Sequence, residues 1–145
     1  MNVYSELNER HQQEFNEFPM VFAFSKEQLD KAMVKLGLDP GDTDKVVGFF
    51  GGGIYRKSDQ GKLDELLERQ RREKQQAIDD DKTGKGYIFH MFYAVLDGHE
   101  FGFTEELDDS LELLGLTMEE IEKSKPLKRG LKLAIEKIKK RSALK

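Results

Sequence analysis

Residues 46–57 read VVGFFGGGIYRK, and this stretch is the strongest single indication of the fold. Valine, phenylalanine, isoleucine and tyrosine favour the half-buried surface of a pleated sheet. The triple glycine at residues 51–53 separates two such segments, and glycine reaches the positive φ angles that tight turns require. The pattern therefore predicts two short strands joined by a glycine turn or bulge. An alternative interpretation is a loop whose bare amides hold an anion beside Arg56 and Lys57.

The glycines match neither of the common nucleotide-binding loops. A Walker loop requires GxxxxGK followed by serine or threonine, and no such continuation follows these glycines. A dinucleotide fingerprint requires GxGxxG, but the third glycine position is occupied by Arg56. The sequence therefore argues against both classes at this loop.

Length and composition indicate one soluble domain over residues 1–145. The chain has no cysteine, which excludes disulfides and thiolate chemistry and fits a reducing compartment. The first residues are polar, and no apolar run approaches the roughly 20 residues of a membrane span. We therefore expect no signal peptide, no membrane segment and a cytoplasmic location.

Apolar periodicity and capping residues predict an α+β fold. A small, mainly antiparallel sheet of three or four short strands is expected to be covered by five or six helices. The predicted strands are residues 20–24, expected at the centre of the sheet, 46–50, 53–57 and 101–103. Helices are predicted at residues 3–18, from Ser25 to Leu36, at 62–78, after 104, after 117 and from 126 onwards. Residues 87–96, YIFHMFYAVL, fit a buried helix slightly better than a long strand.

Charge is distributed unevenly along the chain. The formal net charge is −4, yet the stretch from Lys123 to the end holds ten basic residues and one acid. Residues 104–122 hold eight acids and no base. Two interpretations follow: the basic helix shields the acidic helices, or its cations contact phosphates. The polar run at 68–76, ERQRREKQQ, is interpreted as a solvated helix face.

No residue pattern indicates catalysis or a metal site. Asp79, Asp81 and Thr83 match the start of an EF-hand loop, but its twelfth position is His90, where a bidentate glutamate is needed. An acidic capped turn is therefore favoured over calcium binding. The three histidines lack metal-ligand spacing, and no nucleophile motif occurs. We expect no metal, no cofactor and no enzymatic activity.

Four segments together resemble a family of small proteins. They read NEFPMVFAFSKEQLDKAMVKLGL, GGGIYRKSD, DKTGKGYIFHMFYAVLDGHEF and LGLTMEE. They are similar to an uncharacterised family from phages and mobile elements of gut-type anaerobic bacteria, with no established activity. The resemblance implies a host-directed protein, such as an inhibitor of a bacterial defence protein.

The leading functional hypothesis is a non-enzymatic protein-interaction module whose partner is a bacterial protein. Its candidate binding residues are Gly51, Gly52, Gly53, Tyr55, Arg56, Glu105, Glu106, Asp108 and Asp109. A second hypothesis is nucleic-acid binding through Lys128, Arg129, Lys132, Lys139 and Lys140. A third is a small ligand or anion at the triple-glycine turn, with Tyr55, Arg56, His90 and His99 as the polar set.

Overall fold

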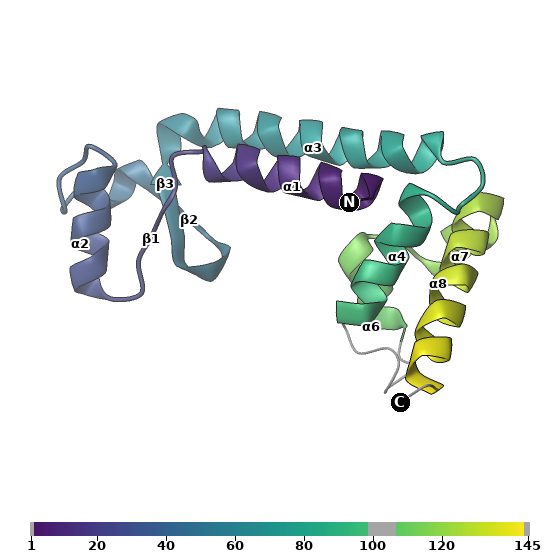
Figure 1. Cartoon of the computed structure of the whole chain (residues 1–145). Coiled ribbons are helices and arrows are strands. Elements are labelled where there is room, and N and C mark those ends of the chain that lie inside the picture. Colours follow the sequence, from purple (N-terminus) through teal and green to yellow (C-terminus); the bar gives the residue numbers. More distant parts are fainter. Residues whose placement is uncertain (1, 99–106, 144–145) are drawn as a thin grey trace. The chain divides into compact units, whose positions relative to one another are not determined.

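The computed structural model describes residues 2–98 and 107–143, with the exception of the Ser142 side chain (Figure 1). It is an α+β protein with a small antiparallel sheet and a majority of helix. The chain divides into two compact units. Arg10–Arg72 form the sheet unit, and Met1–Glu9 with Glu73–Lys145 form the helical unit. The division falls within helix α1 (Val3–Asn16) and helix α3 (Gln60–Asp80).

The sheet unit is built around the glycine hairpin. Strands β2 (Val46–Phe49) and β3 (Gly53–Arg56) pair antiparallel, and Phe50–Gly52 form a 3-10 turn between them. Gly51 and Gly52 have φ angles of 76° and 83°, which side chains with a Cβ rarely adopt. The predicted pair of strands joined by a glycine turn is confirmed.

The strand predicted at residues 20–24 is shorter than expected, and its central position was wrong. Strand β1 is only Val21–Phe22, and the strand order β1-β3-β2 places it at the edge. The strand is short because helix α2 (Lys26–Lys35) begins soon after it, capped by the Ser25 side chain. β3 is central because one of its edges pairs with β2 and the other with β1. The strand predicted at residues 101–103 lies outside the described residues.

A small apolar core supports the sheet unit. Side chains of α2, β3 and α3 are buried in it: Ala32, Met33, Leu36, Tyr55 and Leu63. Short 3-10 turns at Thr43–Lys45 and Lys57–Asp59 connect the strands to the helices.

The polar run at residues 68–76 is not entirely a solvated face. Gln70 is only 7% exposed, and its amide nitrogen donates to the carbonyl of His11 at 3.0 Å and to Glu14 at 3.2 Å. Arg69 also pairs with Glu14, with its nitrogen 2.9 Å from the carboxylate. A polar side chain can hold a contact position because these hydrogen bonds satisfy its buried amide.

The helical unit packs α4 (Tyr87–Gly98) against α8 (Lys125–Ala143), with α6 (Asp108–Leu114) and α7 (Met118–Glu122) beside them. The helix favoured for residues 87–96 is confirmed. Its core comprises Ile88, Phe92 and Leu96 from α4 and Leu131, Ala134 and Ile138 from α8, among others. Within the described residues, none of the helices has the length and apolar character needed to cross a membrane.

Gly130 allows a close contact between α4 and α8. A Cβ at this position would lie 2.4 Å from Cγ2 of Ile88 and 2.7 Å from the carbonyl oxygen of Gly84. No side chain fits that space without movement of the backbone or of Ile88.

The turn before α4 is organised by Asp81. Its carboxylate accepts the backbone N–H groups of Gly84, Gly86 and Ile88, each at 3.0 Å. This is the acidic capped turn that the sequence favours. The helix predicted at residues 62–78 is longer than expected, because α3 continues to Asp80.

Candidate partner-binding site at the sheet edge

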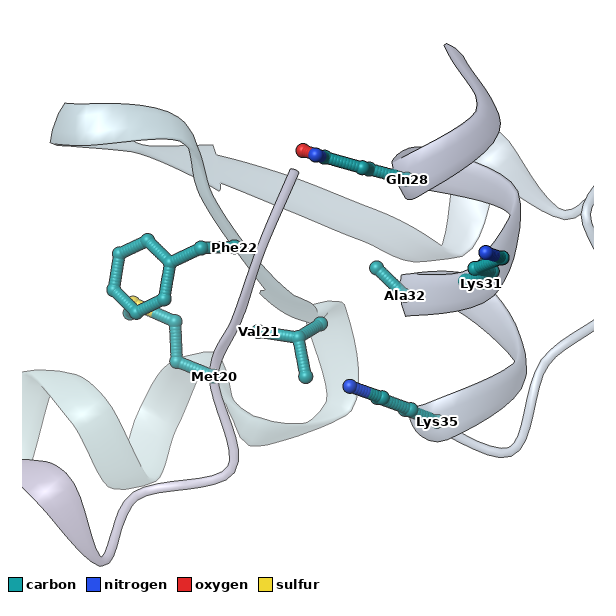
Figure 2. Close-up of a pocket in the computed structure, with 7 residues that line it drawn as sticks. All are labelled: Met20, Val21, Phe22, Gln28, Lys31, Ala32 and Lys35. Atoms are coloured by element: carbon teal, nitrogen blue, oxygen red, sulfur yellow. The ribbon is translucent and has the colours of Figure 1, made fainter. Parts of the chain in front are cut away.

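A hollow of about 360 Å³ lies between β1 and α2 in the sheet unit (Figure 2). Gln28, Ala32 and Lys35 extend from α2 toward β1, and Val21 points back toward them, whereas Phe22 lies on the other face of the strand. The lining residues are Met20, Val21, Phe22, Gln28, Lys31, Ala32 and Lys35. Met20, Val21 and Phe22 are consecutive, so the hollow runs along β1, which pairs with β3 along one edge only and has a free edge.

At the free edge of β1, the backbone N–H and C=O of one residue, Phe22, are available for pairing. The N–H of Ala23 donates to the carbonyl of Gly52 at 3.0 Å, and Phe22 stands opposite Gly53. Because hydrogen-bonded and non-hydrogen-bonded pairs alternate in antiparallel sheets, the N–H and C=O of Phe22 point away from β3. The next outward N–H, that of Phe24, is already bonded to the Gln28 side chain at 2.8 Å.

Exposed aromatic side chains surround the hairpin and the edge strand. Phe22, Phe24 and Phe50 are 53%, 76% and 90% exposed. Phe24 lies against Gly52, where a Cβ would come within 2.7 Å of its ring. The Phe24 ring can therefore pack against the turn only because Gly52 has no side chain. We call Phe22, Phe24 and Phe50 the aromatic rim.

The charge of the hollow is positive. Lys31 and Lys35 are the charged groups among its described lining residues. Lys31 approaches Glu27 at 3.6 Å, but both side chains are largely exposed, so water screens this pair. The hollow therefore offers two ammonium groups beside apolar surface, which suits a ligand with carboxylates and apolar groups.

The sequence-predicted residues of the hairpin do not form one cluster. Gly53 stands opposite Phe49 and Arg56 opposite Val46, so the glycine turn and Arg56 occupy opposite ends of β3. The guanidinium of Arg56 is 2.9 Å from the carboxylate of Asp59. Tyr55 is buried, and its ring packs edge-to-face on Phe18.

The other predicted residues belong to the helical unit. Asp108 and Asp109 are exposed in the first turn of α6. His90 is half-buried on α4, with its ring 5.0 Å from that of Phe89. His99, Glu105 and Glu106 lie outside the described residues.

All five cations of the nucleic-acid hypothesis are exposed on α8: Lys128, Arg129, Lys132, Lys139 and Lys140. Lys128 pairs with Glu122 of α7 at 3.0 Å. This contact supplies part of the expected shielding between basic and acidic helices.

Sequence reasoning selected the glycine turn but missed the hollow beside it. Lys31 and Lys35 looked like ordinary polar positions on an amphipathic helix. The available signal was aromatic: FAF at residues 22–24 and FF at 49–50 place phenylalanines beside chain reversals. Large apolar side chains next to tight turns often remain partly exposed, because a turn lies at the surface.

The described residues contain no group of three or more histidine, aspartate or glutamate side chains that could hold a metal ion. Comparison with known families gives a match over residues 3–137, nearly the whole chain, to a family of unknown function (DUF7659). The chain belongs to the DUF7659 family. Neither the curated proteins nor the solved structures gave a match. The function of the DUF7659 family is unknown, so a functional proposal for this member rests on its surfaces.

Proposed function

We propose that this DUF7659 protein is a non-enzymatic interaction module that binds an extended, acidic and apolar segment of another protein. The observation that carries the proposal is the hollow beside β1, lined by Phe22, Lys31 and Lys35 among others, with the rest of the aromatic rim exposed in the same unit. The resemblance to phage and mobile-element proteins suggests a partner in the cytoplasm of a bacterial host, with a defence protein as the candidate class.

Backbone pairing is the first step of the proposed recognition. An extended segment can add to a sheet edge, where main-chain hydrogen bonds give affinity and side-chain pockets give specificity. The outward N–H and C=O of Phe22 provide one such pair of bonds. The short edge limits this contribution, so side-chain contacts must supply most of the affinity.

Apolar contacts and charge are the second step. Aromatic side chains at an interface bury large areas and dominate its energy. An apolar residue of the partner would occupy the hollow against Val21 and Ala32, and the aromatic rim would cover its neighbours. Carboxylates on the same segment would face Lys31 and Lys35, which gives specificity and speeds association.

A peptide selection tests this proposal. The full-length protein selects from a displayed library of random peptides, and soluble versions of the selected peptides are titrated by fluorescence anisotropy. We expect enrichment of extended sequences that combine aspartate or glutamate with apolar residues. The double variant K31E/K35E should bind these peptides at least about tenfold more weakly, equivalent to 1.4 kcal/mol.

The matched control is K62E/R72E, which changes net charge equally at exposed positions of α3 in the same unit. Its peptide affinity should stay within about twofold of wild type, because charges far from a binding site act mainly through long-range forces that salt screens. An equal loss of peptide affinity in the two variants would show that only the net charge of the protein matters. Selection of basic peptides, or of none, would contradict the proposal.

A further inference from the structure

The helical unit carries a second surface, formed by one side of α8. The opposite side of this helix, with Leu127, Leu131, Ala134 and Ile138, is buried in the core. With 3.6 residues per turn, the exposed side brings seven charged residues into one stripe. We call this stripe the cationic face; it consists of Lys125, Lys128, Arg129, Lys132, Glu136, Lys139 and Lys140.

Within the described part of the chain, most of the cations on this face form no internal ion pair. Lys128 pairs with Glu122. Lys125, Arg129, Lys132 and Lys140 have no ion-pair partner within residues 2–98 and 107–143. Glu136 is the single acid of the stripe. A row of unpaired cations along several helical turns is suited to a regularly charged polyanion.

Aromatic side chains of α4 lie beside other cations of α8. Phe89 and Tyr93 are half-buried and stack at 5.9 Å between ring centroids. Nζ of Lys137 lies 4.8 Å from the centre of the Tyr93 ring. Arg141 donates to the Tyr93 hydroxyl and pairs with Asp97. The sequence of α8 alone shows no aromatic residue among its cations; the packing of α4 supplies them.

We propose that the cationic face and the Phe89–Tyr93 pair bind single-stranded nucleic acid. Phosphates would follow the cationic face, and a base would lie against the ring pair. Proteins that bind single strands combine a cationic track with aromatic rings, because every base offers a face for stacking. This surface and the sheet edge share no residue, so the two proposals stand or fall separately.

Other polyanions fit less well. A membrane-surface helix inserts its apolar stripe into the lipid boundary, whereas that of α8 is buried in the core. A duplex hides its bases within the stack, so the aromatic pair would contribute nothing to its binding.

The test is fluorescence anisotropy with a labelled oligothymidylate of about 20 nucleotides, a length that exceeds typical single-strand site sizes. A blunt duplex of the same length and anionic phosphatidylserine vesicles serve as comparison ligands. The test variant is K128E/R129E/K132E. The matched control is K74E/K82E/K85E, three exposed lysines of the same unit with the same change in charge.

We expect the wild type to bind the single strand more tightly than the duplex, with affinity falling steeply between about 50 and 200 mM salt. The test variant should lose at least about tenfold in affinity and flatten the salt dependence, and the control should lose less than about threefold. The conservative variant F89L should reduce the preference for single strands. Circular dichroism and thermal unfolding check that all variants fold.

Three results would overturn the inference. The first is absence of oligothymidylate binding at about 50 mM salt. The second is an equal loss in both triple variants, which would show that net charge alone matters. The third is tighter binding to the duplex or to vesicles, which would assign the cationic face to a different polyanion.

Discussion

Phe50 has the most exposed large apolar side chain among the described residues. Such a residue adds little to folding, because it buries almost no area from water. We predict that F50S changes the free energy of unfolding by less than about 0.5 kcal/mol. The same variant should weaken binding of the selected peptides at least about fivefold, since aromatic anchors carry much of an interface's energy.

Urea unfolding and peptide titration measure the two effects of F50S. The control is L113S, which changes an exposed leucine of α6 in the helical unit. Peptide affinity should be unchanged in L113S. Wild-type affinity in F50S would remove Phe50 from the binding surface.

The Asp81 carboxylate makes the stability of the fold depend on pH. Burial disfavours its charged form, but hydrogen bonds from Ile88, Gly84, Gly86 and the Thr83 hydroxyl outweigh burial and hold its pKa below the ordinary 3.8. A depressed pKa contributes stability above the unfolded-state pKa, and this contribution is lost as the pH falls toward the folded-state value.

We predict that D81N lowers the free energy of unfolding by about 1–3 kcal/mol at neutral pH, because its amide cannot accept all of these bonds. The difference in the free energy of unfolding between wild type and D81N should become smaller as the pH falls below about 4. Urea unfolding across pH measures this difference. A difference of constant size would show that the charge of Asp81 contributes nothing.

Tyr87 has the opposite pH behaviour. Burial, with a smaller contribution from Tyr4, raises the pKa of its hydroxyl to about 12. The unfolded chain ionises first, so the stability associated with neutral Tyr87 is complete below pH 10 and is lost as the pH rises toward 12. We predict that Y87F loses less stability than the wild type over this alkaline range. Parallel slopes in alkaline urea unfolding would contradict the assignment.

At the scale of elements, the contact between α4 and α8 depends on a missing side chain. We predict that G130A lowers the free energy of unfolding by about 1–3 kcal/mol, because its Cβ would overlap Ile88 and the Gly84 carbonyl. In G61A, on exposed α3 surface, nothing lies within 4 Å of the new Cβ. That control should be neutral or stabilising by about 0.4–1 kcal/mol. Equal effects in urea unfolding would exclude the close contact.

Most elements were predictable because their signals are local. The caps of α2 and α7 join Ser25 to Gln28 and Thr117 to Glu120, residues three positions apart that can be recognised in the sequence. The glycine hairpin follows from φ requirements. The buried Gln70 was not predictable, since its partner His11 lies 59 positions away and gives no local signal.

The strand order could not be predicted from local sequence, for a similar reason. An apolar run such as residues 20–24 is equally compatible with a central or an edge strand. The outcome depends on which edge of β3 is left after the hairpin forms. The hollow beside β1 depends on that outcome, so the candidate site could not be derived from the sequence although its aromatic residues could be noticed.

At the scale of the whole molecule, the two compact units carry different surfaces. The sheet unit presents aromatic side chains and two lysines at an open strand edge, and the helical unit presents the cationic face. The overall charge of −4 conceals both positive surfaces. Net charge is therefore a poor guide to the partners of this DUF7659 member.

The most direct test of the central proposal is residue-resolved NMR of the full-length, ¹⁵N-labelled protein during titration with the tightest selected peptide. We predict shift changes at β1, α2 and the hairpin, and slower hydrogen exchange at the Phe22 amide, which the added strand would bond. The cationic face should show no comparable change. An unchanged Phe22 amide, or shift changes confined to the helical unit, would contradict binding at the sheet edge.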